Sequence, residues 1–151
     1  MIAKYEGKYY CVDMSTEPVD IWCYSPVEGF EESITRRGIV YYEKTVALDE
    51  IERIFDVGFS VNWDGQWCGV FYSATKEIVS LHTNNRDFAI AHGMEEFERG
   101  TFECAVPADM FNEFRMWMRD VVQQTEVYTI ISFEEFKSLW KQMISDLIPP
   151  R

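Results

Sequence analysis

The stretch VGFSVNWDGQWCGVFY, residues 57–72, places two alternating apolar runs on either side of the dipeptide Asp64-Gly65. Asp-Gly between two such runs is a strong signal for a β-hairpin with a two-residue type I′ turn. The turn sets Trp63 opposite Gln66 and Asn62 opposite Trp67, and this register fixes the two faces. The face expected to meet a core carries Phe59, Val61, Trp63, Cys68 and Val70. The other face, which includes Trp67, is only partly apolar, so it is either covered by another layer or offered to a partner.

Six further segments are predicted to be strands, because they are rich in β-branched and aromatic residues or alternate with period two. They are residues 4–12, 19–24, 38–47, 77–83, 101–106 and 126–131. Residues 25–38 contain Pro26, Gly29 and Gly38 among several glutamates and read as an exposed loop with one helical turn. The pattern of residues 86–100 fits a strand and a short helix equally well, and both readings stay open.

Three segments have helical spacing of apolar residues. A short helix is expected over residues 49–56, and a longer one from Pro107, with a stripe formed by Met110, Phe111, Phe114, Trp117, Met118 and Val121. Ser132 followed by Glu135 forms a capping box for a last helix, which Pro149-Pro150 ends. The predicted fold class is α+β in one domain over residues 1–151: a mainly antiparallel sheet with a central Asp-Gly hairpin, packed by two C-terminal amphipathic helices and one short helix.

The chain is strongly acidic, with 26 Asp and Glu against 14 Lys and Arg and a net charge of −12. This charge repels nucleic acids and anionic membranes and attracts basic proteins. The four cysteines, Cys11, Cys23, Cys68 and Cys104, are widely spaced and lie in apolar runs, so they are expected to be buried free thiols. No apolar stretch resembles a signal peptide or a membrane span. Together these features predict a cytoplasmic protein.

No motif for nucleotide, phosphate or metal binding, or for a hydrolase nucleophile, occurs in the sequence. The chain is therefore expected to be no enzyme and to have no catalytic or metal-binding residues and no cofactor. An alternative remains open: a small enzyme or ligand-binding domain in which His82 or His92 serves as a base, or pairs with Cys104 or Cys68 as a nucleophile. A structural accessory protein of a phage or mobile element is a third reading.

The acidic residues are unevenly distributed. Residues 1–35 have a net charge of −5 and residues 94–122 of −4, whereas residues 36–46 are net positive. An acidic surface near aromatic side chains is what an electrostatically steered protein inhibitor needs.

In length, acidity, aromatic content and lack of catalytic motifs, the chain resembles the small acidic immunity proteins of bacterial polymorphic toxin and contact-dependent growth inhibition systems. The resemblance implies a cytoplasmic, non-catalytic protein that neutralises a basic partner, commonly a nuclease toxin domain, by plugging its active site or blocking an exosite. The net charge argues against a nucleic-acid or membrane partner. The candidate partner-binding residues are Asp20, Tyr24, Glu28, Glu31, Glu32, Asp64 and Trp67.

Overall fold

The computed structural model of the chain describes residues 1–150. Strands account for 51% of the protein and helices for 17%, and all strand pairings with a defined register are antiparallel. The contacts divide the chain into two compact units. Unit 1 comprises Met1–Val57, Met118–Glu126 and the chain from Lys137 onward, and unit 2 comprises Gly58–Trp117 and Val127–Phe136. The single domain over residues 1–151 stays a prediction.

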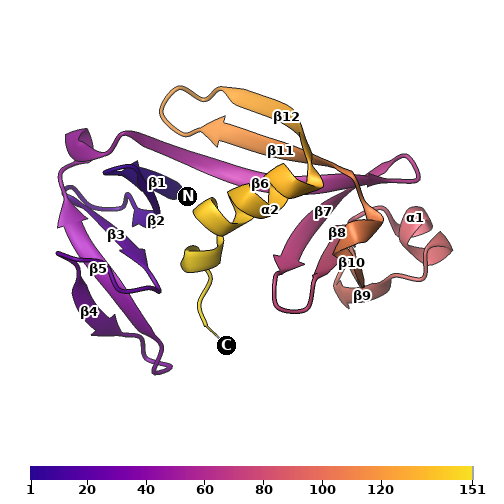
Figure 1. Cartoon of the computed structure of the whole chain (residues 1–151), viewed down its shortest axis with the longest axis horizontal. Coiled ribbons are helices and arrows are strands. Elements are labelled where there is room, and N and C mark those ends of the chain that lie inside the picture. Colours follow the sequence, from indigo (N-terminus) through magenta and orange to yellow (C-terminus); the bar gives the residue numbers. More distant parts are fainter. Residues whose placement is uncertain (151) are drawn as a thin grey trace. The chain divides into compact units, whose positions relative to one another are not determined.

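Unit 1 is built on a twisted antiparallel sheet with the strand order β4-β5-β3-β2-β1-β6. Its strands, which are labelled in Figure 1, are β1 (Ile2–Tyr5), β2 (Lys8–Asp13), β3 (Val19–Cys23), β4 (Glu31–Ile34), β5 (Val40–Val46) and the first part of β6 (Arg53–Trp63). A 3-10 turn, η1 (Leu48–Glu50), precedes β6.

The two faces of the unit 1 sheet differ in what they bury. One face carries the core cluster Ala3, Tyr5, Tyr10, Val12, Val19, Ile21, Cys23, Val46 and Ile54. Val27 and Phe30, from the segment predicted to be an exposed loop, pack against this core, and the Phe30 ring stacks on Tyr10 with 5.0 Å between centroids. Near β1, Ile2 and Phe55 of the opposite face form a second cluster with Met143, which comes from the C-terminal helix.

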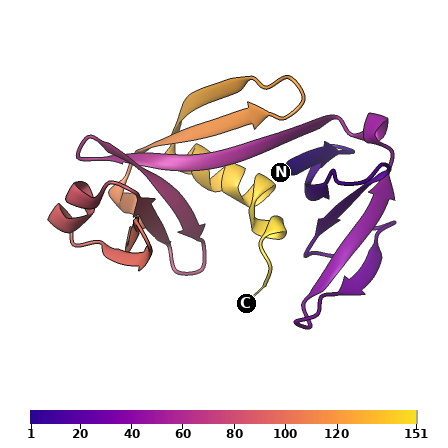
Figure 2. The same cartoon turned by 180° about the vertical axis from the view of Figure 1, so that it is seen from behind.

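Unit 2 has the strand order β6-β7-β8-β10-β9. Its further elements are β7 (Gln66–Ser73), β8 (Ile78–Thr83), α1 (Arg86–Ala91), β9 (Glu95–Glu98), β10 (Thr101–Pro107) and η2 (Ala108–Met110). β11 (Glu113–Asp120) pairs with β6 and with β12 (Glu126–Ser132), as the view from behind shows (Figure 2). The core of unit 2 is aromatic: the fully buried rings of Phe114 and Phe136 stack with 4.2 Å between centroids and 6° between planes.

The central hairpin is confirmed. β6 and β7 pair Trp63 with Gln66, Asn62 with Trp67 and Val61 with Cys68. Asp64 and Gly65 both have positive φ, 48° and 87°, as a type I′ turn requires. Of the predicted inward face, Phe59, Val61, Cys68 and Val70 are buried and Trp63 is half-buried.

The predicted fold class is wrong in its helices: among residues 1–150, the C-terminal part forms one α-helix, α2 (Phe133–Met143), and not two. Residues 113–120, predicted as helix, form β11, in which Phe114 is buried while Arg115 and Arg119 alternate with apolar residues. The apolar residues of this segment fit both the helical spacing and the two-residue alternation of a strand, and pairing with β6 selects the strand. Residues 49–56 contain no α-helix either, since β6 begins at Arg53 and pairs with β1.

Two strand assignments also differ from expectation. Residues 4–12 are two strands, β1 and β2, joined by Glu6 and Gly7 with φ of 47° and 76°. The segment 25–38 includes β4, which pairs with β5. The capping box of the last helix is confirmed: the Glu135 backbone N–H donates to Ser132 Oγ at 3.1 Å, and the Ser132 N–H donates to Glu135 Oε1 at 3.3 Å.

Candidate functional site

An acidic face lies on the unit 1 sheet, on the side opposite the main core. Side chains alternate between the two faces of a strand, so the register determines its members. Asp13 of β2 pairs with Asp20 of β3, Trp22 of β3 pairs with Glu43 of β5, and Glu43 pairs with Glu31 of β4. The acidic face therefore consists of Asp13, Asp20, Trp22, Glu31, Tyr41 and Glu43. β3, β5 and β4 lie side by side in Figure 1.

Two like-charge pairs make this face unusual. Asp13 is directly opposite Asp20, and Glu31 is directly opposite Glu43. Like charges directly opposite each other in an antiparallel pair destabilise the sheet. None of these four carboxylates forms an ion pair with a cation among residues 1–150. The fold thus keeps uncompensated negative charge on one surface at a cost in stability.

Hydrogen bonds hold several of these carboxylates in place. Thr45 Oγ1 donates to Asp20 Oδ1 at 2.7 Å, and Ser33 Oγ donates to Glu43 Oε1 at 2.8 Å. The backbone N–H of Ser15 donates to Asp13 Oδ1 at 2.8 Å and holds the pKa of Asp13 below its ordinary value of 3.8. Asp13 is therefore ionised at neutral pH.

Aromatic side chains accompany the carboxylates. Trp22 lies in the same transverse row as Glu43 and Glu31, and Tyr41 is two residues from Glu43 on the same side of β5. Both rings are half-buried. Aromatic side chains are enriched at interface centres and charges at the rims, so this combination suits a protein partner with basic residues.

The predicted partner-binding residues of unit 1 are only partly brought together. Asp20 and Glu31 belong to the acidic face, and Tyr24 follows β3, where its N–H donates to the Asp146 carbonyl of η3 (Ser145–Leu147) at 2.9 Å. Glu32 lies on the opposite side of β4, where it accepts a hydrogen bond from Tyr42 Oη at 3.3 Å. Glu28 is exposed in the segment between β3 and β4.

The other two predicted residues, Asp64 and Trp67, lie in unit 2. Asp64 Oδ2, in the turn between β6 and β7, is 2.8 Å from Nε2 of His92, which follows α1. The Trp67 ring lies 4.1 Å from the guanidinium carbon of Arg115, which is also 4.8 Å from the Tyr128 ring. Trp67 is thus part of an aromatic and arginine cluster on the outer face of the unit 2 sheet.

The two histidines considered as catalytic groups have different surroundings. The Nδ1 of His92 is 2.9 Å from the Phe88 carbonyl oxygen, so both ring nitrogens face acceptor oxygens. Only the protonated ring donates from both, and the Asp64 hydrogen bond accordingly raises the pKa of His92 above 6.5. The His82 ring lies against the backbone of Gly69, where a Cβ would collide with it. Burial lowers the pKa of His82 despite the opposing charge of Glu103.

The four cysteines are free thiols; Cys23 and Cys68 are buried and Cys11 and Cys104 are half-buried. Burial raises the pKa of Cys68 to about 11 and raises the pKa of Cys104 as well. A nucleophilic cysteine needs a lowered pKa, so these shifts run against the paired histidine and cysteine reading.

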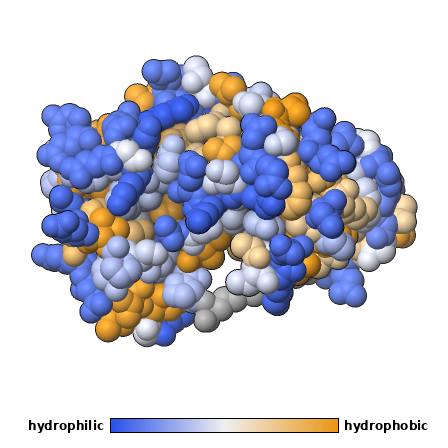
Figure 3. All heavy atoms as spheres, in the orientation of Figure 1, coloured by the Kyte–Doolittle hydropathy of each residue, from blue (hydrophilic) through white to orange (hydrophobic). Residues whose placement is uncertain are grey.

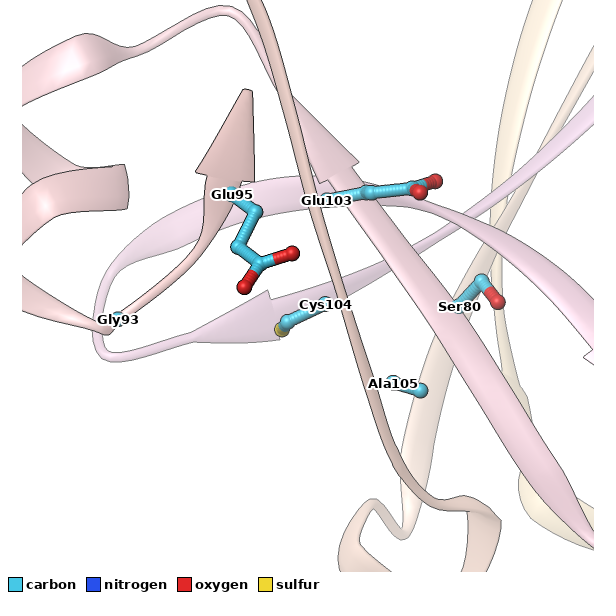
Figure 4. Close-up of a pocket in the computed structure, with 6 residues that line it drawn as sticks. All are labelled: Ser80, Gly93, Glu95, Glu103, Cys104 and Ala105. Atoms are coloured by element: carbon cyan, nitrogen blue, oxygen red, sulfur yellow. The ribbon is translucent and has the colours of Figure 1, made fainter. Parts of the chain in front are cut away.

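A shallow pocket of about 330 Å³ lies on unit 2 and is lined by Ser80, Gly93, Glu95, Glu103, Cys104 and Ala105 (Figure 4). Glu95 and Glu103 come from the neighbouring strands β9 and β10 and pair directly. They are a third like-charge pair. Among residues 1–150, no group of three or more His, Cys, Asp or Glu side chains is arranged to hold a metal ion.

Comparison with known proteins adds no relative: no protein family, curated protein or solved structure matches this chain. Within the described residues, no helix has the length and apolar character needed to cross a membrane.

Proposed function

We propose that the chain is a binding module for a basic protein, which docks on the acidic face of unit 1. The observation that carries this proposal is two directly opposed like-charge pairs on one side of the sheet, Asp13 with Asp20 and Glu31 with Glu43. None of these four carboxylates has an ion-pair partner among residues 1–150. A basic surface set against these carboxylates would relieve their mutual repulsion on binding, so binding and stability are coupled.

The charge of the whole chain supports the same partner class. A net charge of −12 accelerates encounter with a basic protein through long-range attraction. Trp22 and Tyr41 then supply the aromatic contact area that carboxylates alone lack. More specifically, the partner would be a nuclease toxin and this chain its immunity protein, as the resemblance of the sequence to small acidic immunity proteins implies.

The proposal is tested by comparing three baits in pull-downs from a lysate of the native host. The first is wild type, and the second neutralises the acidic face with Asp20→Asn, Glu31→Gln and Glu43→Gln. The third is a control with the same charge change on exposed residues of unit 2: Glu98→Gln, Asp109→Asn and Glu113→Gln.

The expected result is one abundant basic protein retained by wild type and control and lost from the acidic-face variant. The retained protein is then purified and its binding measured directly, so that recovery from the lysate alone does not decide the question. Equal retention by all three baits would contradict the placement of the interface, and retention of acidic or neutral proteins alone would contradict the partner class.

A further inference from the structure

Three strands of the described chain pair on one side only and so present a free hydrogen-bonding edge: β4, β9 and β12. A free edge is a template for another strand, and proteins normally protect it with charges, proline or bulges. β4 carries Glu31 and Glu32 at its edge, and β9 carries Glu95, Glu96 and Glu98. These charges repel a second acidic strand.

β12 lacks such protection. Its sequence EVYTIIS has no charge after Glu126 and contains neither proline nor glycine. Val127, Tyr128 and Ile130 are 56%, 57% and 55% exposed. Both cartoon views show β11 on one side of β12 and no strand on the other. Figure 3 shows hydrophobic residues interspersed with hydrophilic ones over the β11–β12 hairpin.

We propose that the free edge of β12 pairs antiparallel with β12 of a second copy of this chain, about a two-fold axis at Thr129. This register sets Tyr128 opposite Ile130, Val127 opposite Ile131 and Glu126 opposite Ser132. Aromatic and β-branched residues opposite each other stabilise an antiparallel pair, and no like charges meet.

The symmetry of the segment is the reason to assign a second copy rather than a foreign strand. A two-fold interface must be self-complementary, and the apolar residues on either side of Thr129 meet each other under that operation. A strand from a basic protein would gain nothing from its charge here, because residues 127–132 carry none.

The net charge of −12 opposes self-association, so added salt strengthens the dimer by screening the two copies from each other. Binding of a basic partner to the acidic face has the opposite salt dependence. The two proposals can therefore fail separately.

The test measures the mass of the whole chain by sedimentation equilibrium over a range of protein and salt concentrations. Wild type is expected to reach twice the 17.8 kDa chain mass, more readily at high salt. Thr129→Lys and Thr129→Glu each place like charges opposite one another at the axis and are expected to weaken the dimer about fourfold at low salt and about twofold at physiological salt. An equal mixture of the two variants should recover wild-type affinity, because lysine then faces glutamate.

The control is Thr125→Lys, the same substitution in the exposed turn before β12, which is expected to leave the dimer unchanged. Recovery in the mixture also shows that both Thr129 variants are folded. A wild type that stays monomeric at millimolar concentration and high salt would overturn the proposal. So would Thr129 variants that dimerise like wild type, or a mixture that does not recover.

Discussion

Neutralising Glu31 should stabilise the protein, because this residue lies directly opposite Glu43. Cross-strand neighbours are about 5.5 Å apart, and two unit charges at that distance repel by about 0.8 kcal/mol in water of low ionic strength. At physiological salt the Debye length of about 8 Å reduces this to roughly 0.4 kcal/mol. Glu31→Gln should recover this amount, and Glu31→Lys, which replaces repulsion by attraction, about twice as much.

The measurement is urea unfolding followed by tryptophan fluorescence at low and high salt. With a denaturant slope of about 2 kcal/mol per molar, Glu31→Gln should raise the midpoint by about 0.4 M at low salt and by less at high salt. Glu113→Gln, an exposed residue of unit 2, serves as the control with the same change in net charge. An unchanged or lower midpoint for Glu31→Gln, or an equal gain for Glu113→Gln, would refute the account of the acidic face.

Three further predictions concern unit 2. Gly69→Ala should cost about 1–3 kcal/mol of unfolding free energy through the collision with His82, and the cost should vanish in a His82→Ala background; equal costs in the two backgrounds would contradict the close approach. Gly65→Val should lower the denaturation midpoint far more than Gly65→Asn, because φ is 87° at this turn position; equal midpoints would be inconsistent with the strained turn. Because its pKa is raised, protonated His92 stabilises the protein fully below pH 6.5, and this stabilisation is lost as the pH rises through the raised pKa. Asp64→Asn should therefore weaken the dependence of the melting temperature on pH over this range, and an unaltered dependence would count against the contact between Asp64 and His92.

Local signals in the sequence were sufficient where neighbours along the chain decide the structure. The Asp64-Gly65 turn and the capping box at Ser132 depend only on residues within a few positions, and both are confirmed. The Glu6-Gly7 turn is equally local and adopts the same positive φ angles, yet its flanking tyrosines read as one continuous strand. Gly7 was the residue in the sequence that indicated a turn here.

Tertiary pairing decided the segments that were predicted wrongly. Residues 113–120 fit a helical stripe and an alternating strand, and only the neighbouring β6 makes the strand the lower-energy choice. Ile54 and Phe55 likewise fit a short helix, but they pair with Ala3 and Ile2 of β1.

The acidic face was partly foreseeable. Asp20 and Glu31 were predicted as contacts from charge and position, whereas Asp13 and Glu43 were not. Their role depends on the register of β2 with β3 and of β4 with β5. Because β4 lies in a segment that reads as a loop, the sequence alone did not indicate which acids face each other.

Capture of a basic protein by the acidic face makes association depend on salt. The rate of association with the partner recovered by wild type is measured by stopped flow at increasing ionic strength. The on-rate is expected to fall steeply with salt while the off-rate changes little. The Asp20→Asn, Glu31→Gln, Glu43→Gln variant is expected to associate more slowly than wild type and with a weaker dependence on salt. An on-rate that does not depend on salt, or a variant that associates as fast as wild type, would contradict capture by the acidic face.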